Sequence, residues 1–316
     1  MKQISKWNAR VLRVLKAPGN VERLMTSLEQ VKLNQGKLLS LANLSMNSTS
    51  LQDYEFKIFS QWGEDGIIQK LISSVEIKGK TFIEFGVEDF TESNCRFLMT
   101  NNNWSGFIMD GSTVNIAKIK NSQFYWAYEL QAVHAFINRD NVNNLLKLSG
   151  FGNDLGILSI DIDGIDYWVL EAIDRSFLPR ILIVEYNAVF GCDRAISVPY
   201  DPQFNRTTHH HSNLYFGASL PAFVHLAGKR GYDLVGTNSA GGNAFFVRRD
   251  LMNGSLKPLS AKDGYTRSKA RESRDRDGRF TFLTGDDRLT AIRGLPVIDV
   301  ITKDLAPGGQ IEPEKL

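Results

Sequence analysis

The chain has 316 residues, of which 42% are hydrophobic and 23% charged, an ordinary composition for a folded protein with one large or two modest domains. There are 37 Lys and Arg residues against 35 Asp and Glu residues, and the resulting net charge of +2 gives no case for a nucleic-acid-binding protein. The two cysteines, Cys95 and Cys192, have neither CxxC nor zinc-site spacing, so we expect a cytoplasmic protein rather than a disulfide-built secreted one.

Residues 1–16 are basic and amphipathic. Lysine and arginine recur there without an acidic residue, and the apolar side chains fall near one face of a helix. The pattern fits peripheral contact with the anionic inner face of a membrane. It fits equally a basic helix that docks on another subunit or on its own domain.

Residues 21–38 carry a heptad-like pattern. Apolar residues recur there at alternating spacings of three and four, and Gln35 interrupts the series. The apolar residues of this seam are Val21, Leu24, Leu28, Val31 and Leu38. This seam predicts a short coiled coil and therefore a homo-oligomer formed through the N-terminal helices. Because the seam is short and contains Gly36, an intramolecular hairpin is the alternative. The polar stretch that follows places a domain boundary near residue 50, dividing a helical segment (1–50) from a main domain (51–316).

Strands and helices alternate after residue 53. We expect strands at residues 81–85, 105–109, 125–130, 155–160, 181–184, 232–237 and 244–248. Helices are expected near residues 67–72, 95–100, 141–146, 167–173 and 218–229. This alternation predicts an α/β fold with a largely parallel sheet, closed by a strand hairpin.

The first two predicted strands end in carboxylates. Glu84 ends the first, with Gly86 after it, and Asp110 ends the second, with Ser112 after it. Open α/β sheets bind ligands at this edge, and an ionised Asp110 accepts hydrogen bonds from both hydroxyls of a ribose. Helix capping by Glu84 and turn formation by Asp110 are the alternatives. The single glycine of the first loop argues against a GxGxxG dinucleotide site and a nicotinamide-dependent oxidoreductase.

The central stretch, residues 155–170, ends in a group of acids, and the next strand ends at Glu185 with Asn187 after it. In one interpretation Asp161, Glu185 and Asn187 hold Mg²⁺ or another divalent cation, which lowers the pKa of a substrate hydroxyl. In the other the acids bind hydroxyls directly, and Asp163 or a nearby histidine accepts the proton.

A long connection, about residues 198–218, contains three consecutive histidines. Long loops often cover active sites, and His210 and His211 are candidate general bases because a histidine pKa lies near neutrality. The loop also carries aromatic side chains suited to stacking on a carbohydrate ring, namely Tyr200, Phe204, Tyr215 and Phe216. An ordinary solvated loop is the alternative.

Three motifs resemble those of the FkbM-type methyltransferases. They are SQWGEDG at residues 60–66, FIEFGVEDF at residues 82–90 and DIDGIDYWVL at residues 161–170, and the resemblance spans about residues 53–251. It implies a Rossmann-like seven-stranded sheet that binds S-adenosylmethionine. The implied activity is O-methylation of a sugar, glycan or small-molecule hydroxyl by direct methyl displacement.

The same resemblance implies the cofactor-binding residues. Glu84 and Gly86 would line the methionine part of the cofactor. Asp110, with Ser112 beside it, would hold the ribose. Asp161 would face the amino end or the reacting centre. Gln61 and Asp65 would close over the carboxylate end. The first loop has less glycine and more acid than the family pattern, and this favours the rival interpretation of a non-catalytic assembly protein with the same fold.

A C-terminal extension begins at about residue 252. Residues 262–279 are highly charged with almost no apolar content, which predicts an exposed segment. Such a segment either guides an anionic acceptor or is simply a solvated loop. Residues 280–283 and 295–301 regain strand character.

Overall fold

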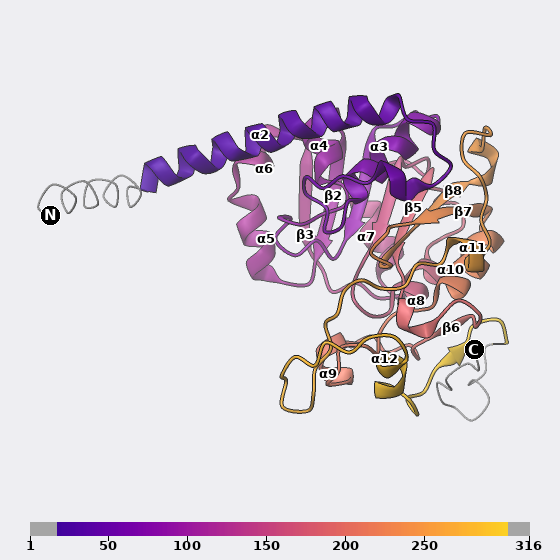
Figure 1. Ribbon diagram of the computed structural model, residues 1–316. Coiled ribbons are helices and arrows are strands. Elements are labelled where there is room, and N and C mark those ends of the chain that lie inside the picture. Colours follow the sequence, from indigo (N-terminus) through magenta and orange to yellow (C-terminus); the bar gives the residue numbers. More distant parts are fainter. Residues whose placement is uncertain (1–17, 303–316) are drawn as a thin grey trace, which may run out of the picture.

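A computed structural model describes residues 18–302 of the protein. Its centre is a seven-stranded sheet in the order β3-β2-β1-β4-β5-β8-β7 (Figure 1). β1 to β5 run parallel, whereas β8 lies antiparallel between β5 and β7. The strands are β1 (Thr81–Phe85), β2 (Ser105–Asp110), β3 (Leu130–His134), β4 (Ile157–Ile160), β5 (Ile181–Glu185), β7 (Tyr232–Thr237) and β8 (Asn243–Arg248). The predicted Rossmann-like seven-stranded fold class is confirmed.

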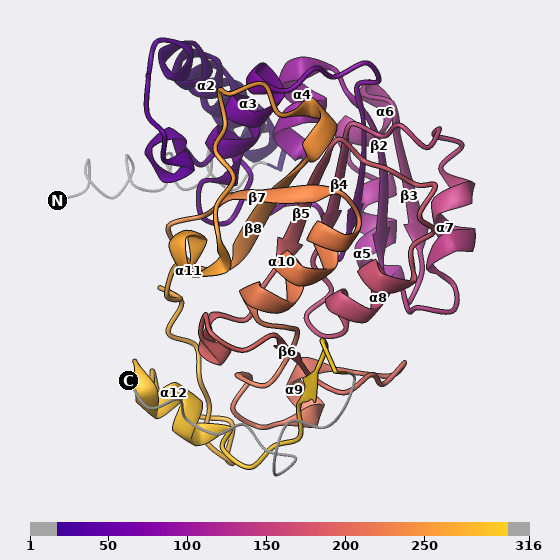
Figure 2. The ribbon, with the colours of Figure 1, turned by 90° about the vertical axis from the view of Figure 1, so that its right-hand side faces the viewer.

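Helices cover both faces of the sheet, as Figures 1 and 2 show. One core lies under α3 (Glu64–Ser74), α4 (Arg96–Asn102) and α5 (Thr113–Lys120). The other lies under α7 (Val142–Leu148), α8 (Asp166–Ala172) and α10 (Leu220–Lys229). Successive strand residues point to opposite faces, so Phe82 joins the first core and Ile83 the second.

Short elements complete the described chain. They are η1 (Leu51–Tyr54), α6 (Gln123–Ala127), η2 (Ala188–Phe190), β6 (Ile196–Ser197), α9 (Arg206–His209), η3 (Arg249–Leu251), α11 (Ala261–Gly264), α12 (Asp286–Ala291) and β9 (Ile298–Asp299). β6 and β9 form a separate two-stranded sheet. No helix within residues 18–302 is long and apolar enough to cross a membrane.

The third predicted strand was placed about five residues too early. Residues 123–127 form helix α6, and the strand begins at Leu130. The aromatic side chains of Phe124, Tyr125 and Tyr128 pack on the core beneath α3 to α5, so packing overrides the usual preference of aromatic residues for strands. The predicted strand at residues 280–283 is also wrong, because only one isolated bridge forms there. Of residues 295–301, only Ile298–Asp299 form a strand.

Helix α2 (Pro18–Leu44) is one continuous helix that crosses over α3 and α4 (Figure 1). Its body-facing side carries Gly36, where a Cβ would collide with the ring of Phe97. The intramolecular hairpin is therefore not formed within residues 18–44. The predicted basic helix at residues 1–16 lies outside the described residues.

The charged segment at residues 262–279 is held to the domain by defined contacts. The backbone of Lys269 donates a hydrogen bond to Ala240, and that of Arg274 donates one to Ser212. The side chain of Asn213 donates a hydrogen bond to Glu272 Oε1 at 3.1 Å. The segment is thus tied to the loops at the carboxyl edge of the sheet.

Candidate functional site

Two adjoining cavities lie at the carboxyl ends of β1, β2, β4 and β5. The wide cavity has a volume of about 370 Å³, and the acidic cavity about 190 Å³. Both are lined by Gly86, Glu88, Asp161, Asp163 and Arg206. The edge predicted to bind a ligand therefore carries one continuous hollow with two compartments.

Gly86 brings the β1 loop against the end of β4. Phe85 is in register with Ile160, so the following residues of the two strands leave the sheet side by side. At φ +71°, Gly86 adopts a backbone conformation that favours glycine, and a Cβ there would overlap the carbonyl oxygen of Asp161. This contact sets the boundary between the two cavities.

Asp110 lines the wide cavity and also organises its wall. Its Oδ2 accepts a hydrogen bond from the backbone of Glu88 at 2.8 Å, and its Oδ1 accepts one from the backbone of Ser112 at 2.8 Å. The turn-forming role that was the alternative interpretation is therefore present, and the residue also lies on the cavity wall. Ser112 caps α5 by accepting a hydrogen bond from Asn115, and it does not line either cavity.

Residues 161–166 are shaped by a carboxylate that does not reach the cavities. Asp166 is buried and accepts hydrogen bonds from the backbones of Ile162 at 2.8 Å and Gly164 at 3.0 Å. Burial outweighs these bonds and raises the pKa of Asp166 to about 6. The turn that it closes presents Asp161 and Asp163 to the cavities.

Asp161, Asp163 and Glu185 form an acidic cluster. Each offers a carboxylate oxygen within 4.8 Å of the others, a spacing that suits a hard divalent cation. Desolvation, followed by the neighbouring carboxylates, raises the pKa of Asp161 and of Glu185 well above their ordinary values. The site therefore favours either a bound proton or a positively charged ligand.

Arg206, on α9, supplies a positive charge next to the acidic cluster. Its Nη1 lies 2.5 Å from Asp163 Oδ1, and its guanidinium stacks 3.9 Å from the ring centroid of Phe216. Although desolvation opposes it, the charges of Glu185 and Asp163 raise the pKa of Arg206. The sequence identified Arg206 as a hydrogen-bonding residue of the long loop but did not indicate this ion pair, because Arg206 follows Asp163 by more than forty positions.

Asn187 is not a metal ligand in this structure. Its amide nitrogen donates hydrogen bonds to the carbonyls of Leu214 and Phe216, both at 2.9 Å. Its amide oxygen accepts a hydrogen bond from Val189 at 2.9 Å. The prediction that Asn187 joins Asp161 and Glu185 is wrong, and Asp163 takes its place in the cluster.

Two predicted cofactor ligands have structural roles. Asp65 is 1% exposed, lines neither cavity and accepts three hydrogen bonds from the backbone of residues 58–60. Glu84 lines the acidic cavity, but its carboxylate accepts hydrogen bonds from Ser93 Oγ at 2.6 Å and Asn94 N at 2.7 Å. It therefore anchors the start of α4, the alternative role considered above. Burial raises the pKa of Glu84 to about 7.

The acidic cavity contains an unused buried acceptor. Asn243, at the start of β8, donates a hydrogen bond through Nδ2 to Glu64 Oε1 at 3.0 Å. Its Oδ1 is buried and has no partner among residues 18–302. Gln61, a predicted cofactor-binding residue, lines the same cavity. Asn243 has no sequence signal, because its position depends on the hairpin that inserts β8 between β5 and β7.

The three histidines stand outside both cavities. His209 interacts with Asp201 at 3.0 Å, and His210 Nδ1 lies 2.7 Å from Ser212 Oγ. Desolvation and the neighbouring His211 lower the pKa of His210. None of the three lines either cavity, so the described geometry does not bring the predicted bases to the acids.

The aromatic side chains of the loop belong to the core. Phe204, Tyr215 and Phe216 are 5–7% exposed, and Tyr200 is partly buried and packs on Trp168. The prediction that these rings form an open stacking platform is therefore wrong, although Phe204 contributes to the wall of the wide cavity. The loop borders the cavities through its polar residues Asn205, Arg206, Thr207 and Asn213.

No protein-family model matches the sequence, and no curated protein matches it. Among solved structures, a methyltransferase from Geobacter sulfurreducens with S-adenosylhomocysteine is 15% identical, with a TM-score of 0.32, over 64% of this chain and 72% of that one. A methyltransferase from Thiobacillus denitrificans with the same ligand is 14% identical over 62% and 70%, with a TM-score of 0.32. The DszA carbon methyltransferase is 12% identical over 60% and 53%, with a TM-score of 0.37.

Proposed function

We propose that the protein is an S-adenosylmethionine-dependent O-methyltransferase. The observation that carries the proposal is the pair of cavities that meet at Gly86 and Asp161, one walled by a strand-end carboxylate and the other strongly acidic. They lie at the carboxyl ends of the parallel strands, where open α/β sheets bind nucleotide-like ligands.

The residues present fit this cofactor. In the wide cavity, the carboxylate of Asp110 would accept hydrogen bonds from ribose hydroxyls, and residues 135–137 after β3 would form an apolar wall for a base. In the acidic cavity, the carboxylates favour the positive charge of a sulfonium and an ammonium group. The unpartnered Oδ1 of Asn243, for which no donor exists among residues 18–302, suits the ammonium.

When bound, the cofactor supplies an electrophilic methyl group on a positively charged sulfur. Asp161 and Glu185 stabilise that charge, and Gln61 with Asn243 hold the amino-acid end. Glu185 accepts the proton of the acceptor hydroxyl, because its carboxylate has no hydrogen-bond partner among residues 18–302 and its pKa is raised. Asp163, the alternative base, is held in an ion pair by Arg206. The reaction needs no covalent enzyme intermediate, and alignment of the reactants supplies much of the acceleration.

The proposed acceptor is a hydroxyl of a sugar, a glycan or a related small molecule, as the FkbM resemblance implies. Polar residues of the loop before α10 border the wide cavity and offer hydrogen bonds to such hydroxyls. Mg²⁺ is proposed as an optional partner of Asp161, Asp163 and Glu185, held by their carboxylate oxygens.

Isothermal titration with S-adenosylhomocysteine, with and without Mg²⁺, tests the proposal. We expect the wild type to bind S-adenosylhomocysteine with micromolar affinity. A Glu185→Gln variant, titrated in the same way, shows whether any effect of Mg²⁺ on this affinity depends on the acidic cluster. If Mg²⁺ tightens binding in the wild type but not in the variant, the acidic cluster holds the metal. If the ligand binds under neither condition, the enzyme proposal fails and the non-catalytic assembly protein replaces it.

We also propose that α2 forms a parallel coiled coil with α2 of a second copy. The seam residues Val21, Leu24, Leu28, Val31 and Leu38 are each 44–68% exposed, although they are apolar. They lie away from the side that holds Gly36 against the domain. At the heptad e and g positions, which flank the seam, Lys32 is the only charged residue within residues 20–41. Pairing of identical helices therefore meets little charge repulsion.

A further inference from the structure

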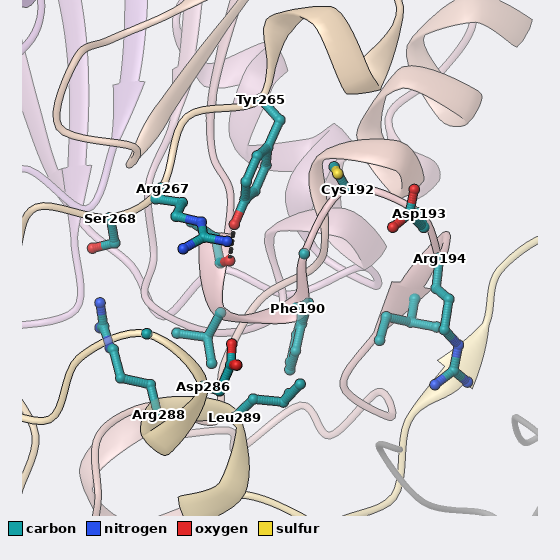
Figure 3. Close-up of a pocket in the computed structure, with 15 residues that line it drawn as sticks. Phe190, Cys192, Asp193, Arg194, Tyr265, Arg267, Ser268, Asp286, Arg288 and Leu289 are labelled. Atoms are coloured by element: carbon teal, nitrogen blue, oxygen red, sulfur yellow. Dashed lines mark hydrogen bonds between the residues drawn. The ribbon is translucent and has the colours of Figure 1, made fainter. Parts of the chain in front are cut away.

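A third cavity, of about 240 Å³, opens beyond the end of β5, between η2 and α12 (Figure 3). Its wall contains three arginines, Arg194, Arg267 and Arg288. The cavity is separate from the cofactor compartments, since it shares no lining residue with them. Ala188, on its wall, lies only three positions after Glu185 of the acidic cluster.

Arg288 is a buried cation without a counter-charge. It is 9% exposed, and its Nη1 donates a hydrogen bond to the carbonyl of Ala270 at 2.9 Å. Its Nε is buried without a partner, and Arg288 forms no ion pair among residues 18–302. Buried charges in proteins are normally paired, because desolvation of an isolated charge costs several kcal/mol.

The charged groups around Arg288 do not supply the missing negative charge. Desolvation, followed by the positive charge of Arg206, lowers the pKa of the Arg288 guanidinium. Asp286 and Asp193 also line the cavity, yet both are exposed and neither forms an ion pair with an arginine of the described chain. The cavity wall therefore carries a net positive charge that an anionic ligand would neutralise.

Arg267 supplies further donors from the segment after α11, whereas the hydroxyl of the neighbouring Ser268 already donates a hydrogen bond to the carbonyl of Ala270 at 3.3 Å. The side chain of Arg267 has no hydrogen bond or ion pair among residues 18–302 and extends into the cavity near Tyr265 (Figure 3). Ser268 lies on the wall above Arg288 in the same view. Two guanidinium groups provide more donors than a carboxylate can use, and they match the oxygens of a phosphate.

We infer that this cavity binds a phosphate group of the methyl acceptor. The inference rests on the proposed function in treating the anion as part of the acceptor, and it adds the chemical class of that acceptor, a phosphorylated hydroxyl compound. Ala188 on the cavity wall follows Glu185 of the acidic cluster by three positions, and this short connection is what relates the cavity to the cluster that receives the hydroxyl.

The test is titration of the full-length protein with inorganic phosphate, at constant ionic strength maintained with chloride, followed by calorimetry and thermal shift. Acetate is titrated in parallel to separate phosphate from carboxylate recognition. Arg288→Gln is expected to weaken phosphate binding at least about tenfold, and Arg267→Gln at least about threefold. Arg279→Gln removes the same charge from an exposed position of the same segment and is expected to change nothing.

Since Arg288→Gln removes a buried side chain, Arg267→Gln decides the outcome if the first variant fails to fold. Saturable phosphate binding that is weakened by Arg267→Gln and kept in Arg279→Gln supports the inference. Absence of phosphate binding, equal loss in the control, or tighter binding of acetate overturns it.

Titration of the same samples with S-adenosylhomocysteine separates this inference from the proposed function. Arg267→Gln is expected to leave that affinity within about twofold of wild type, because Arg267 lines neither cofactor compartment. If S-adenosylhomocysteine binds and phosphate does not, only the present inference fails. If phosphate binds and S-adenosylhomocysteine does not, the proposed enzyme fails and the anion loses its role as part of a methyl acceptor.

Discussion

Gly86 and Asp161 come from different strands, and their backbones meet so closely that no side chain fits at residue 86. This contact joins the β1 loop to the acidic turn after β4 and divides the hollow at the carboxyl edge into its two compartments. The geometry of both compartments therefore depends on one glycine.

Gly86→Ala is expected to lower the free energy of unfolding by about 2–5 kcal/mol, because it adds a steric overlap to an unfavourable positive φ. Gly254→Ala is the matched control, since Gly254 has φ +85° but open space around its missing Cβ. The control is expected to cost only about 1–2 kcal/mol. Urea unfolding of both variants measures the difference, and equal costs would show that the contact with Asp161 is unimportant.

Asp110→Ala is expected to weaken binding of S-adenosylhomocysteine by about 10- to 100-fold. It removes the acceptor proposed for the ribose and frees the backbone of Glu88, and hydrogen bonds to charged groups are worth about 1.5–3 kcal/mol. Asp89→Ala serves as the control, because Asp89 is a half-buried carboxylate of the same loop that lines neither cavity. Calorimetric titration measures the affinity of both variants, and circular dichroism establishes that they are folded. Equal affinities in the two variants would show that Asp110 does not belong to the binding site.

Glu84 gives the protein a pH-dependent stability. Because burial raises its pKa from 4.5 to about 7, the folded state binds a proton that the unfolded state has released between these values. This contribution is fully present below about pH 4.5 and is lost as the pH rises through about 7. Between pH 5 and 8, wild type should lose about 1–3 kcal/mol more unfolding free energy than Glu84→Gln, which cannot ionise.

The control for that measurement is Glu92→Gln, an exposed carboxylate near the same loop. It is expected to keep the wild-type dependence of stability on pH. Chemical unfolding at several pH values provides the comparison, and parallel curves for wild type and Glu84→Gln would contradict the assignment.

The raised pKa values of Asp161 and Glu185 predict that proton release accompanies binding of a cationic sulfonium beside them. S-adenosylmethionine should therefore release more protons than S-adenosylhomocysteine, whose sulfur is uncharged. Calorimetry in two buffers of different ionisation enthalpy measures this difference. In Asp161→Asn the difference should shrink, whereas an unchanged difference would place the sulfur elsewhere.

The exposed seam of α2 predicts a dimer of roughly twice the 35.5 kDa chain mass. Glutamate at both Leu28 and Val31 would set like charges against each other across the coiled coil and is expected to yield monomers. Gln30→Glu, on an exposed side of the same helix outside the seam, should leave the dimer intact. Light scattering after gel filtration reads the mass, and a wild-type monomer would contradict the proposed pairing.

Local pattern was sufficient for most of the sheet. Six of the seven strands lie within a few residues of their predicted positions, because buried parallel strands are short apolar runs that end in polar residues. The strand-end positions of Glu84, Asp110, Asp161 and Glu185 were predictable for the same reason. The third strand was not, since aromatic residues fit a packed helix as well as a strand.

The use of each carboxylate was decided by the tertiary structure. Asp65, Asp161 and Asp166 are all aspartates within the motifs named above, so the sequence does not distinguish their roles. The fold brings backbone N–H groups to Asp65 and Asp166 and leaves Asp161 facing the cavities. Arg206 and Asn243 reach the acids only through a long loop and a strand hairpin. Sequence by itself determined which residues end the strands, because that depends on neighbours along the chain. Only the tertiary structure decided which of them are free to bind a ligand, because their hydrogen-bond partners come from distant segments.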